Sequence, residues 1–328
     1  MNYTTLGSSG VKVSQLCLGC MNFGGRTDEK ESAKIIHTAL DAGVNFIDTA
    51  DVYNNGVSEE FVGRAIDGVR DDIVLATKFW ASMGDGPNDN GGSRYHIIRA
   101  CEESLRRLDV ERIDLYQIHR PDKETPIEET LRALEDLRKQ GKILYAGCSC
   151  FPAWRHAEAR LIAEHHDYVG FASEQPPYNI LDRYIEKFIL PYCRRHGIGV
   201  IPWSPLSAGW LTGKYRKGQE PPPESRGAKG HWMVNLHSDL GQQKLDQVEQ
   251  LIPLAKECGT SLVRFSLAWL MNRPGVTSPI IGPRTVEQAE DCLASVDVEL
   301  SDEVMEKVDE IVPPGTHGMA EGQYWPEP

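Results

Sequence analysis

Apolar positions follow two different rhythms along the chain. Short runs rich in Val, Ile and Leu alternate with longer segments whose apolar residues recur at helical spacing, and several of these longer segments end at a glycine. This alternation indicates parallel strands joined by crossover helices, and eight such strands suffice to close an α/β barrel. The predicted strands span residues 15–19, 45–49, 73–78, 113–119, 144–149, 171–174, 199–203 and 278–282, and the clearest predicted helices span residues 28–41, 94–108, 127–139 and 182–195.

Three segments interrupt this alternation. Residues 3–13 contain a Gly-Ser-Ser-Gly turn signal at positions 7–10, which predicts an N-terminal β-hairpin across the barrel floor. Residues 81–92 and 213–241 are long insertions that each follow a predicted strand, so we expect both on the face formed by the C-terminal strand ends, as lids. Because α/β barrels routinely reach this length as one unit, we expect a single domain over residues 1–328.

Charge and composition exclude several classes of protein. The formal net charge of −13 argues against a nucleic-acid partner, because phosphate contacts need clustered Lys and Arg. No apolar run approaches the roughly 20 residues needed to cross a bilayer, so no membrane span is expected. The first residues lack the basic and apolar regions of a signal peptide, which predicts a cytoplasmic location.

The 8 cysteines are scattered along the chain, and several lie in apolar strand patterns. We expect them to be reduced and buried. Cys17 and Cys20 form a C-x-x-C pair, but no second Cys or His pair stands at a metal-binding spacing. The sequence therefore predicts no metal.

Four polar residues fall at or just after the ends of three neighbouring predicted strands: Asp48, Tyr53, Lys78 and His119. Together they have the chemistry for moving a proton onto a carbonyl oxygen. Tyr53 would donate the proton, the Lys78 ammonium would lower the pKa of the phenol, and Asp48 would keep Lys78 charged. A neutral His119 would orient the carbonyl. Because no side chain donates a hydride, reduction by these residues requires a cofactor.

The sequences that surround these residues resemble signatures of the aldo-keto reductase superfamily, in the branch of bacterial enzymes and potassium-channel β subunits. The matching stretches are NFIDTADVY at 45–53, ATK at 76–78 and RIDLYQIHRPD at 112–122, and the likeness runs from residue 3 to about residue 312. The resemblance implies a (β/α)8 TIM barrel, NADP(H) as cofactor and a small-molecule carbonyl substrate. It also implies that Asp48, Tyr53, Lys78 and His119 form the catalytic tetrad.

A Gly-x-Gly-x-x-Gly fingerprint is absent after the first strand. The resemblance instead implies that NADPH lies across the barrel mouth. It places Ser149 and Gln175 at the nicotinamide carboxamide and Trp203 against the nicotinamide ring. Residues 204–214 resemble the pyrophosphate-binding loop and residues 282–288 the adenine-end motif, where an arginine paired with the 2′-phosphate favours NADPH over NADH. The implied contacts in these two motifs are Ser204, Leu206, Gly209, Lys214, Gly282, Arg284 and Gln288.

Two residues depart from the family pattern. Cys150 stands where many relatives have Asn beside Ser149, and Cys292 stands where an adenine-contacting Asn is common. A thiol is a poor substitute for an amide at either position. We therefore expect weaker cofactor binding, or contacts made by other residues.

We consider three alternative functions for this sequence. The first is an NADPH-dependent carbonyl reductase, and the second is an NADPH-binding regulatory subunit with little turnover. The third is a metal-dependent barrel hydrolase with Asp48, His119 and Glu174 as ligands, although no His-x-His cluster supports it. Six residues either line an apolar substrate pocket or serve ordinary packing: Phe23, Trp80, Met83, Phe151, Trp154 and Trp232.

Overall fold

Eight parallel strands form the centre of the protein, which we describe for residues 1–319 in a computed structural model. Residues 320–328, the end of the expected domain, lie outside the described residues. The strands are hydrogen-bonded in the order β10-β3-β4-β5-β6-β7-β8-β9. Their bounds are β3 Cys17–Gly19, β4 Phe46–Asp48, β5 Val74–Phe79, β6 Ile113–Ile118, β7 Ile143–Ser149, β8 Phe171–Gln175, β9 Gly199–Val200 and β10 Ile280–Ile281.

The two ends of this sheet meet beside β9. Thr277 N donates to Val200 O at 2.7 Å, and Ile280 N donates to Pro202 O at 2.8 Å. A parallel bridge joins Val200 to Val276. These contacts close the sheet, so the predicted (β/α)8 barrel is confirmed.

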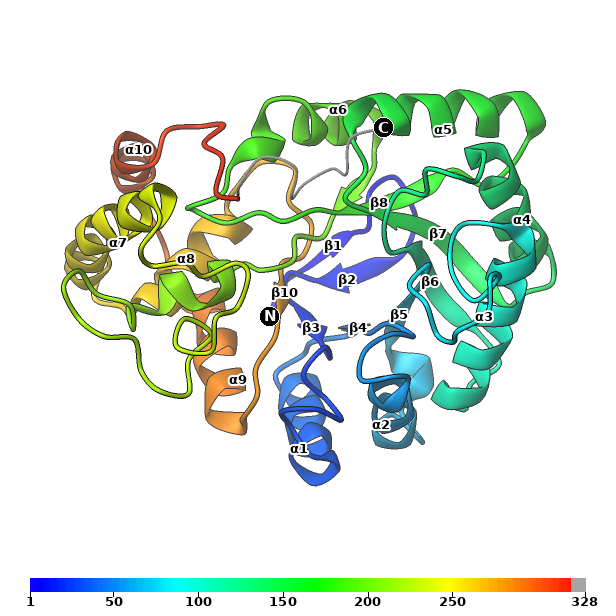
Figure 1. Cartoon of the computed structure of the whole chain (residues 1–328), viewed down its shortest axis with the longest axis horizontal. Helices are drawn as coiled ribbons and strands as arrows, with labels where there is room; N and C mark the ends of the chain where they lie inside the picture. Colours follow the sequence, from blue (N-terminus) through cyan, green and yellow to red (C-terminus); the bar gives the residue numbers. More distant parts are fainter. Residues whose placement is uncertain (320–328) are drawn as a thin grey trace.

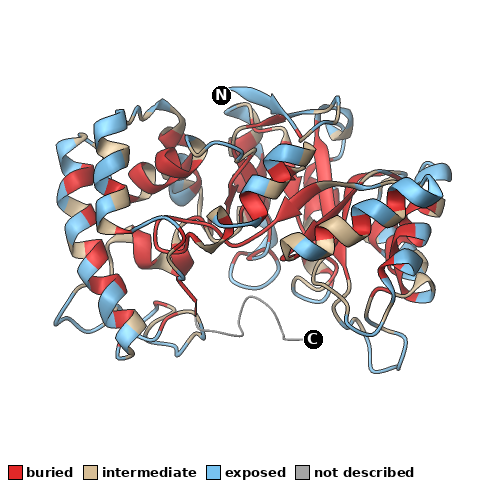
Figure 2. Cartoon of the chain, turned by 90° about the horizontal axis from the view of Figure 1, so that it is seen from above, coloured by how far each residue is buried: buried red, intermediate tan, exposed pale blue. Residues whose placement is uncertain are grey.

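Helices surround the ring of strands (Figure 1). Figure 2 shows the buried residues on the strands and on the inward helix faces, with the exposed residues outside. Within residues 1–319, no helix combines the length and apolar character needed to cross a bilayer. The bounds of the α-helices are α1 Glu29–Asp41, α2 Val57–Ala65, α3 Arg94–Leu108, α4 Ile127–Lys139, α5 Ala153–His166, α6 Ile189–His196, α7 Asp239–Glu257, α8 Leu262–Met271, α9 Val286–Leu293 and α10 Asp302–Ile311.

Three of the four clearest predicted helices have the expected bounds, because their ends carry local signals. Ser93 caps α3 by accepting a hydrogen bond from His96 N, and Asp28 caps α1 by accepting from Glu31 N. The fourth prediction, a helix over residues 182–195, is wrong at its start, since α6 begins at Ile189. The buried Arg183 side chain bonds Asp309 of α10 at 2.7 Å and Val312 O at 2.6 Å, and these long-range contacts hold residues 182–188 outside the helix.

The predicted N-terminal hairpin consists of β1 Tyr3–Thr5 and β2 Lys12–Ser14, paired antiparallel. It crosses the middle of the ring in Figure 1. Leu6 and Val13 are fully buried in an apolar cluster with residues of the barrel strands. The turn lies so close to the barrel that a Cβ on Gly7 would come within 2.3 Å of Gly197 O. Glycine is therefore needed at position 7, and the hairpin seals the barrel floor.

Candidate active site

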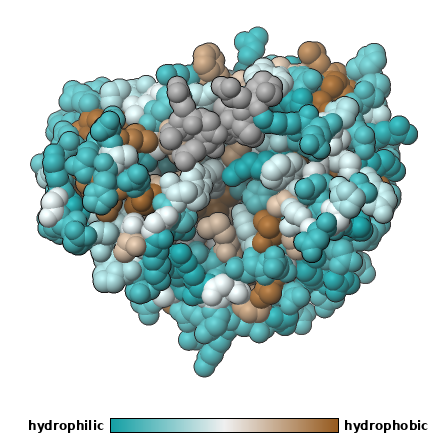
Figure 3. Space-filling model, in the orientation of Figure 1, coloured by the Kyte–Doolittle hydropathy of each residue, from teal (hydrophilic) through white to brown (hydrophobic). Residues whose placement is uncertain are grey.

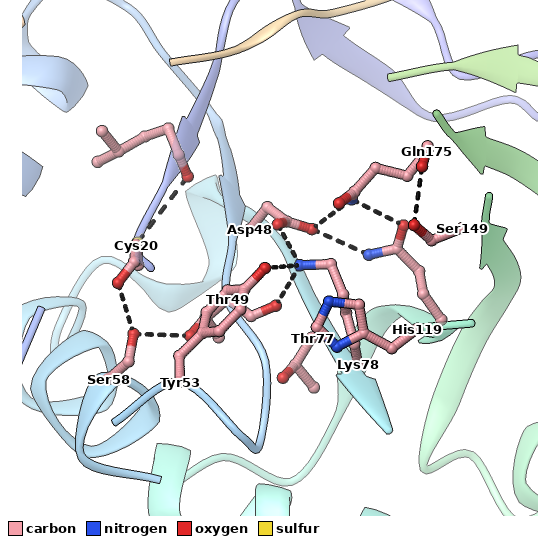
Figure 4. Close-up of polar contacts among 12 residues, drawn as sticks. Cys20, Asp48, Thr49, Tyr53, Ser58, Thr77, Lys78, His119, Ser149 and Gln175 are labelled. Carbon is pink, nitrogen blue, oxygen red and sulfur yellow. Dashed lines mark hydrogen bonds and ion pairs between the residues drawn. The ribbon is translucent and has the colours of Figure 1, made fainter. Parts of the chain in front are cut away.

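The C-terminal strand ends bring the four predicted catalytic residues together (Figure 4). Asp48 is the last residue of β4, Lys78 lies at the end of β5, and His119 directly follows β6. Tyr53 comes from the loop between β4 and α2. In a parallel barrel all strand C-termini face the same end, so these side chains converge there although 71 residues separate the first from the last.

The Lys78 ammonium is fully buried and has a partner for each of its three protons. It forms an ion pair with Asp48, donates to Thr49 O at 2.7 Å and donates to the Tyr53 hydroxyl oxygen at 3.2 Å. Burial alone would lower the pKa of Lys78, but the Asp48 charge and the hydrogen bonds outweigh it and raise this pKa above its ordinary value. Lys78 therefore remains charged.

Tyr53 differs from the expectation in the direction of its pKa. Burial raises the pKa of the phenol, and the nearby Lys78 charge opposes this effect without cancelling it. Tyr53 is thus firmly protonated at neutral pH. Because its oxygen already accepts from Lys78, its own proton is available to a group in the cavity.

The His119 ring is held edge-on to Tyr53, with 5.7 Å between the ring centroids. Burial lowers the pKa of His119 well below its ordinary value, and the charges of Lys78 and Arg120 lower it further, so the ring is neutral. Its Nδ1 is buried without a partner among residues 1–319. A proton on Nδ1 would be unsatisfied, which favours the tautomer protonated on Nε2, towards the cavity.

Two glutamines that the sequence analysis did not connect to the tetrad hold Asp48 in place. Gln117 Nε2 donates to Asp48 Oδ2 at 2.9 Å, and Gln175 Nε2 donates to the same oxygen at 3.0 Å. Gln117 stands in β6 opposite Lys78 of β5. Its place in the motif at 112–122 was visible in the sequence, but its direction depends on strand register.

A cavity of about 660 Å³ opens at this end of the barrel. Figure 3 shows this face with a hollow near its centre, surrounded mostly by hydrophilic residues. Lys78 lies behind the wall, and every other predicted site residue lines the cavity. These residues are Asp48, Tyr53, His119, Ser149, Gln175, Trp203, Ser204, Leu206, Gly209, Lys214, Gly282, Arg284 and Gln288.

Four cationic side chains gather at one end of this cavity: Arg26, Lys214, Arg226 and Arg284. Burial lowers the pKa of Lys214, and the charges of the three arginines lower it further. None of the four has a carboxylate within 4.0 Å in the described part of the chain. The acids that line this end are paired elsewhere, Glu224 with Lys229 and Asp291 with Arg264. The cluster therefore lacks counter-charges of its own, as a site for a polyanion would.

Arg26 and Arg226 in this cluster were not singled out from the sequence. Arg226 lies in the insertion predicted as a lid, between turns that contain no strand or helix. An isolated arginine in a Pro- and Gly-rich insertion was the only signal available, and it does not show that the loop folds back over the cavity.

The loop over residues 204–213 has an unusual backbone. Ser204, Ser207, Ala208 and Gly209 have φ of 57°, 48°, 54° and 102°. Such left-handed turns direct successive N–H groups to one side and form concave anion sites. At Gly209 a Cβ would also stand 2.7 Å from the Lys214 ammonium nitrogen, so glycine lets Lys214 pack over the loop.

The groups near the tetrad retain specific hydrogen-bonding capacity. Ser149 Oγ donates to Gln175 O at 2.8 Å, which leaves its oxygen free to accept. Gln175 has both amide protons directed at Asp48 and Gln117, which leaves its side-chain oxygen able to accept another donor. Trp203 presents its ring to the same region of the cavity. A carboxamide N–H is a suitable donor for these acceptors.

One prediction about the pocket is wrong, and most of the residues considered for its lining do not line it. The insertion over residues 81–92 contributes no residue to the cavity, whereas the second insertion contributes Arg226, His231 and Trp232. Of the six aromatic and methionine candidates for the pocket, only Trp232 lines it. Phe23 and Phe151 are fully buried in the core, and Trp154 is 62% exposed.

The metal-hydrolase alternative required Glu174 beside Asp48 and His119. Glu174 does not line the cavity. Its carboxylate accepts from the Cys148 thiol at 3.2 Å and lies 3.1 Å from His156 Nε2. Within residues 1–319, Cys148, His156 and Glu174 are the group whose ligand atoms lie within 4.8 Å of one another. The proposed ligand set is therefore wrong.

The cysteines are free and mostly buried, as expected. Cys150 adopts a left-handed backbone with φ of 62°, a conformation that Asn adopts more readily than Cys. Cys292 lines the cavity near the cationic cluster. Of the two departures from the family pattern, Cys292 thus lies at the cavity, and Cys150 contacts Arg120, which lines it.

Residues 15–313 match the Aldo/keto reductase family. The chain belongs to this family and is an oxidoreductase that acts on a small-molecule carbonyl compound. The family generally uses NAD(P)H.

Three similar proteins illustrate the range of its relatives. The chain is 41% identical to the uncharacterized oxidoreductase YrpG of Bacillus subtilis, over 95% of this chain and 96% of the relative. It is also 41% identical to a probable voltage-gated potassium channel subunit beta of Arabidopsis thaliana, over 95% and 97% respectively. The versiconal hemiacetal acetate reductase of Aspergillus parasiticus is 33% identical, over 97% and 99%.

Proposed function

We propose that this protein reduces an aldehyde or ketone to the alcohol with NADPH, and that Tyr53 donates the proton. The observation that carries this proposal is the hydrogen bond from Lys78 to the Tyr53 oxygen. Because the Tyr53 oxygen accepts from Lys78, the phenolic proton remains free to be donated to a group in the cavity. The reverse reaction uses the same groups, with Tyr53 as the base.

Each residue of the tetrad has a separate role in the reduction of the carbonyl. His119, protonated on Nε2, orients the carbonyl oxygen and stabilises the charge that develops on it. Tyr53 then gives its proton to that oxygen, and the adjacent Lys78 ammonium stabilises the phenolate that remains. Asp48, held by Gln117 and Gln175, keeps Lys78 charged throughout.

The cavity fits NADPH by charge. Lys214, Arg226, Arg284 and Arg26 would hold the pyrophosphate and the 2′-phosphate, since these cations have no carboxylate partners among residues 1–319. Ser149 and Gln175 would accept from the carboxamide, and Trp203 would face the nicotinamide ring. When bound, NADPH supplies the hydride that no side chain can give. The 2′-phosphate contact favours NADPH over NADH.

A second candidate function is an NADPH-binding regulatory subunit with little turnover. The 41% identity to a relative named as a channel subunit favours it. Both candidates predict NADPH binding, so turnover decides between them. The arrangement of Tyr53, Lys78 and Asp48 favours an enzyme, because cofactor binding alone does not require a proton donor.

The test is the variant Tyr53→Phe, which removes the hydroxyl and keeps the ring. We expect NADPH to bind with unchanged affinity by Trp fluorescence quenching, while reduction of a reactive aldehyde falls about 100- to 10,000-fold. Tyr116→Phe serves as the control, because it removes a buried hydroxyl that lies outside the cavity and has no partner among residues 1–319. Turnover by Tyr53→Phe at the parent rate would exclude Tyr53 as the acid. NADPH binding by the parent protein without reduction of any aldehyde or ketone would favour the regulatory subunit.

A further inference from the structure

Arg120 places a guanidinium at the tetrad end of the cavity. It directly follows His119 and lines the same cavity as Tyr53. Its Nη1 donates to Cys150 Sγ at 2.6 Å and lies 3.4 Å from His119 O. The guanidinium carbon stands 5.6 Å from the centroid of the Trp203 ring. These contacts fix the side chain beside the place where the carbonyl must lie.

The charge of Arg120 has no counter-charge in the described part of the chain. No carboxylate oxygen of residues 1–319 lies within 4.0 Å of its nitrogens, and its Nε and Nη2 have no acceptor there. Arg107 and Arg183 are paired, with Glu59 at 2.7 Å and with Glu186 at 2.9 Å. Arg226 and Arg284 of the cationic cluster resemble Arg120, since they are partly buried and have no carboxylate partner among residues 1–319. Arg120 is half-buried and unpaired, which is unusual for a guanidinium.

Cys150 does not neutralise this charge. Burial raises the pKa of the Cys150 thiol, and the Arg120 charge only partly opposes that rise, so the sulfur is an uncharged acceptor. It engages one of the two terminal guanidinium nitrogens. The remaining N–H groups form a planar fork of the kind that binds a carboxylate through two parallel hydrogen bonds.

We propose that Arg120 forms a carboxylate-binding subsite, and that the preferred substrates are carbonyl compounds that also carry a carboxylate. The substrate class rests on the proposed function, whereas the anion subsite stands on the geometry of Arg120 alone. Arg120 directly follows His119, contacts its carbonyl oxygen and lines the cavity together with Tyr53, so a carboxylate held there lies at the tetrad end of the cavity.

A contact with the cofactor is the competing role for this guanidinium. The anionic part of NADPH is matched by the cluster of Arg26, Lys214, Arg226 and Arg284, and Arg120 is absent from the charges that act on Lys214. At the tetrad end the cofactor carries a neutral carboxamide, for which Ser149 and Gln175 have free acceptors. A second anion is therefore the better match for Arg120.

The test compares 2-, 3- and 4-carboxybenzaldehyde with their methyl esters, using the parent protein, Arg120→Gln and Arg120→Lys at pH 7.5. We expect the parent to prefer at least one acid over its ester. Arg120→Gln should lower kcat/KM for that acid about 10- to 100-fold, mainly through KM, and change the ester less than about threefold. Arg120→Lys should recover part of the loss, because it restores the charge without the fork.

A binding measurement makes the subsite testable without turnover. Benzoate and benzamide are titrated into the NADP⁺-loaded protein by calorimetry. We expect benzoate to bind more tightly than benzamide to the parent and to lose this advantage in Arg120→Gln. Equal losses for acids and esters, equal binding of benzoate and benzamide, or weaker NADPH binding by Arg120→Gln would each overturn the subsite. Arg120-dependent benzoate binding in a protein that reduces no aldehyde would retain the subsite and reject the proposed function.

Discussion

Gln117 donates its side-chain amide to Asp48 across the intervening strand β5, with 2.9 Å between Nε2 and Oδ2. Asp48 is 2% exposed and Gln117 is fully buried, so this bond has no competition from bulk water. The carboxylate that keeps Lys78 charged is thus held in position by a residue outside the tetrad.

Replacing Gln117 with Met should weaken both stability and catalysis. The buried Asp48 oxygen loses one of its two amide donors, so we expect the free energy of unfolding to fall by about 1 to 3 kcal/mol in urea. We also expect kcat to fall about tenfold, the rate equivalent of about 1.4 kcal/mol, at unchanged NADPH affinity. Tyr116→Phe is the control on the same strand, because the buried Tyr116 hydroxyl has no partner among residues 1–319 and its removal should cost little. Equal behaviour of the two variants would contradict this role.

Arg284→Ala should weaken NADPH binding by about 1 to 3 kcal/mol and leave NADH nearly unaffected, as expected for a charge-assisted contact with the 2′-phosphate. Arg226→Ala tests its neighbour in the cationic cluster in the same way. Arg216→Ala is the matched control, since Arg216 lies in the same insertion but is paired with Glu249 at 2.6 Å. Fluorescence titration with each nucleotide gives the comparison. Parallel weakening for NADPH and NADH would remove Arg284 from the 2′-phosphate.

The two insertions should respond differently to cofactor. The lid was predicted over residues 213–241, but α7 begins at Asp239, so the loop itself spans residues 213–238. This loop contributes side chains to the cavity and residues 81–92 do not. We expect NADPH to slow amide hydrogen exchange in 213–238, because a bound ligand restricts a loop that contacts it. Exchange in 81–92 should stay the same and provides an internal reference. An unchanged profile across 213–238 at saturating NADPH would argue against a lid.

The buried Asp51 carboxyl should make the stability of the protein depend on pH. It is fully buried, Oδ2 has no partner among residues 1–319, and burial together with the Glu59 charge raises its pKa to about 8. The unfolded chain releases this proton near pH 4, so between about pH 4 and 8 the folded state binds more protons. The unfolding free energy should therefore fall as pH rises through this window, by at most about 1.4 kcal/mol per pH unit.

Asp51→Asn should flatten this slope, because the amide cannot ionise and has a similar shape. Urea denaturation of both proteins at pH 5, 6, 7 and 8 measures it. If the two proteins show the same slope, Asp51 is not the responsible group.

The sequence was sufficient for the barrel because each strand and helix carries a local signal. Most strands were placed within one or two residues, and the caps at Asp28 and Ser93 defined helix starts. The tetrad was predictable because its residues lie in short motifs at strand ends. What sequence reasoning missed depends on long-range packing. The contacts of Arg183 with α10 displaced a helix start, and the register of β5 and β6 directed Gln117 to Asp48.

The two insertions were also only partly predictable. Both follow strands, so their sequences place them at the C-terminal end of the barrel, but they do not indicate which insertion folds over the cavity. The net pKa of Tyr53 was also misjudged, because the cost of burying the phenol depends on the depth of the cavity as well as on Lys78.

The sealed floor has a consequence for how the site recovers between turnovers. Leu6 and Val13 fill that end of the barrel with apolar side chains, which have no hydrogen-bonding groups of their own. A proton that replaces the one given up by Tyr53 must arrive through the mouth, along the route by which the alcohol leaves. Reloading of the acid is therefore coupled to product departure, and we expect the proton and the alcohol to share one route.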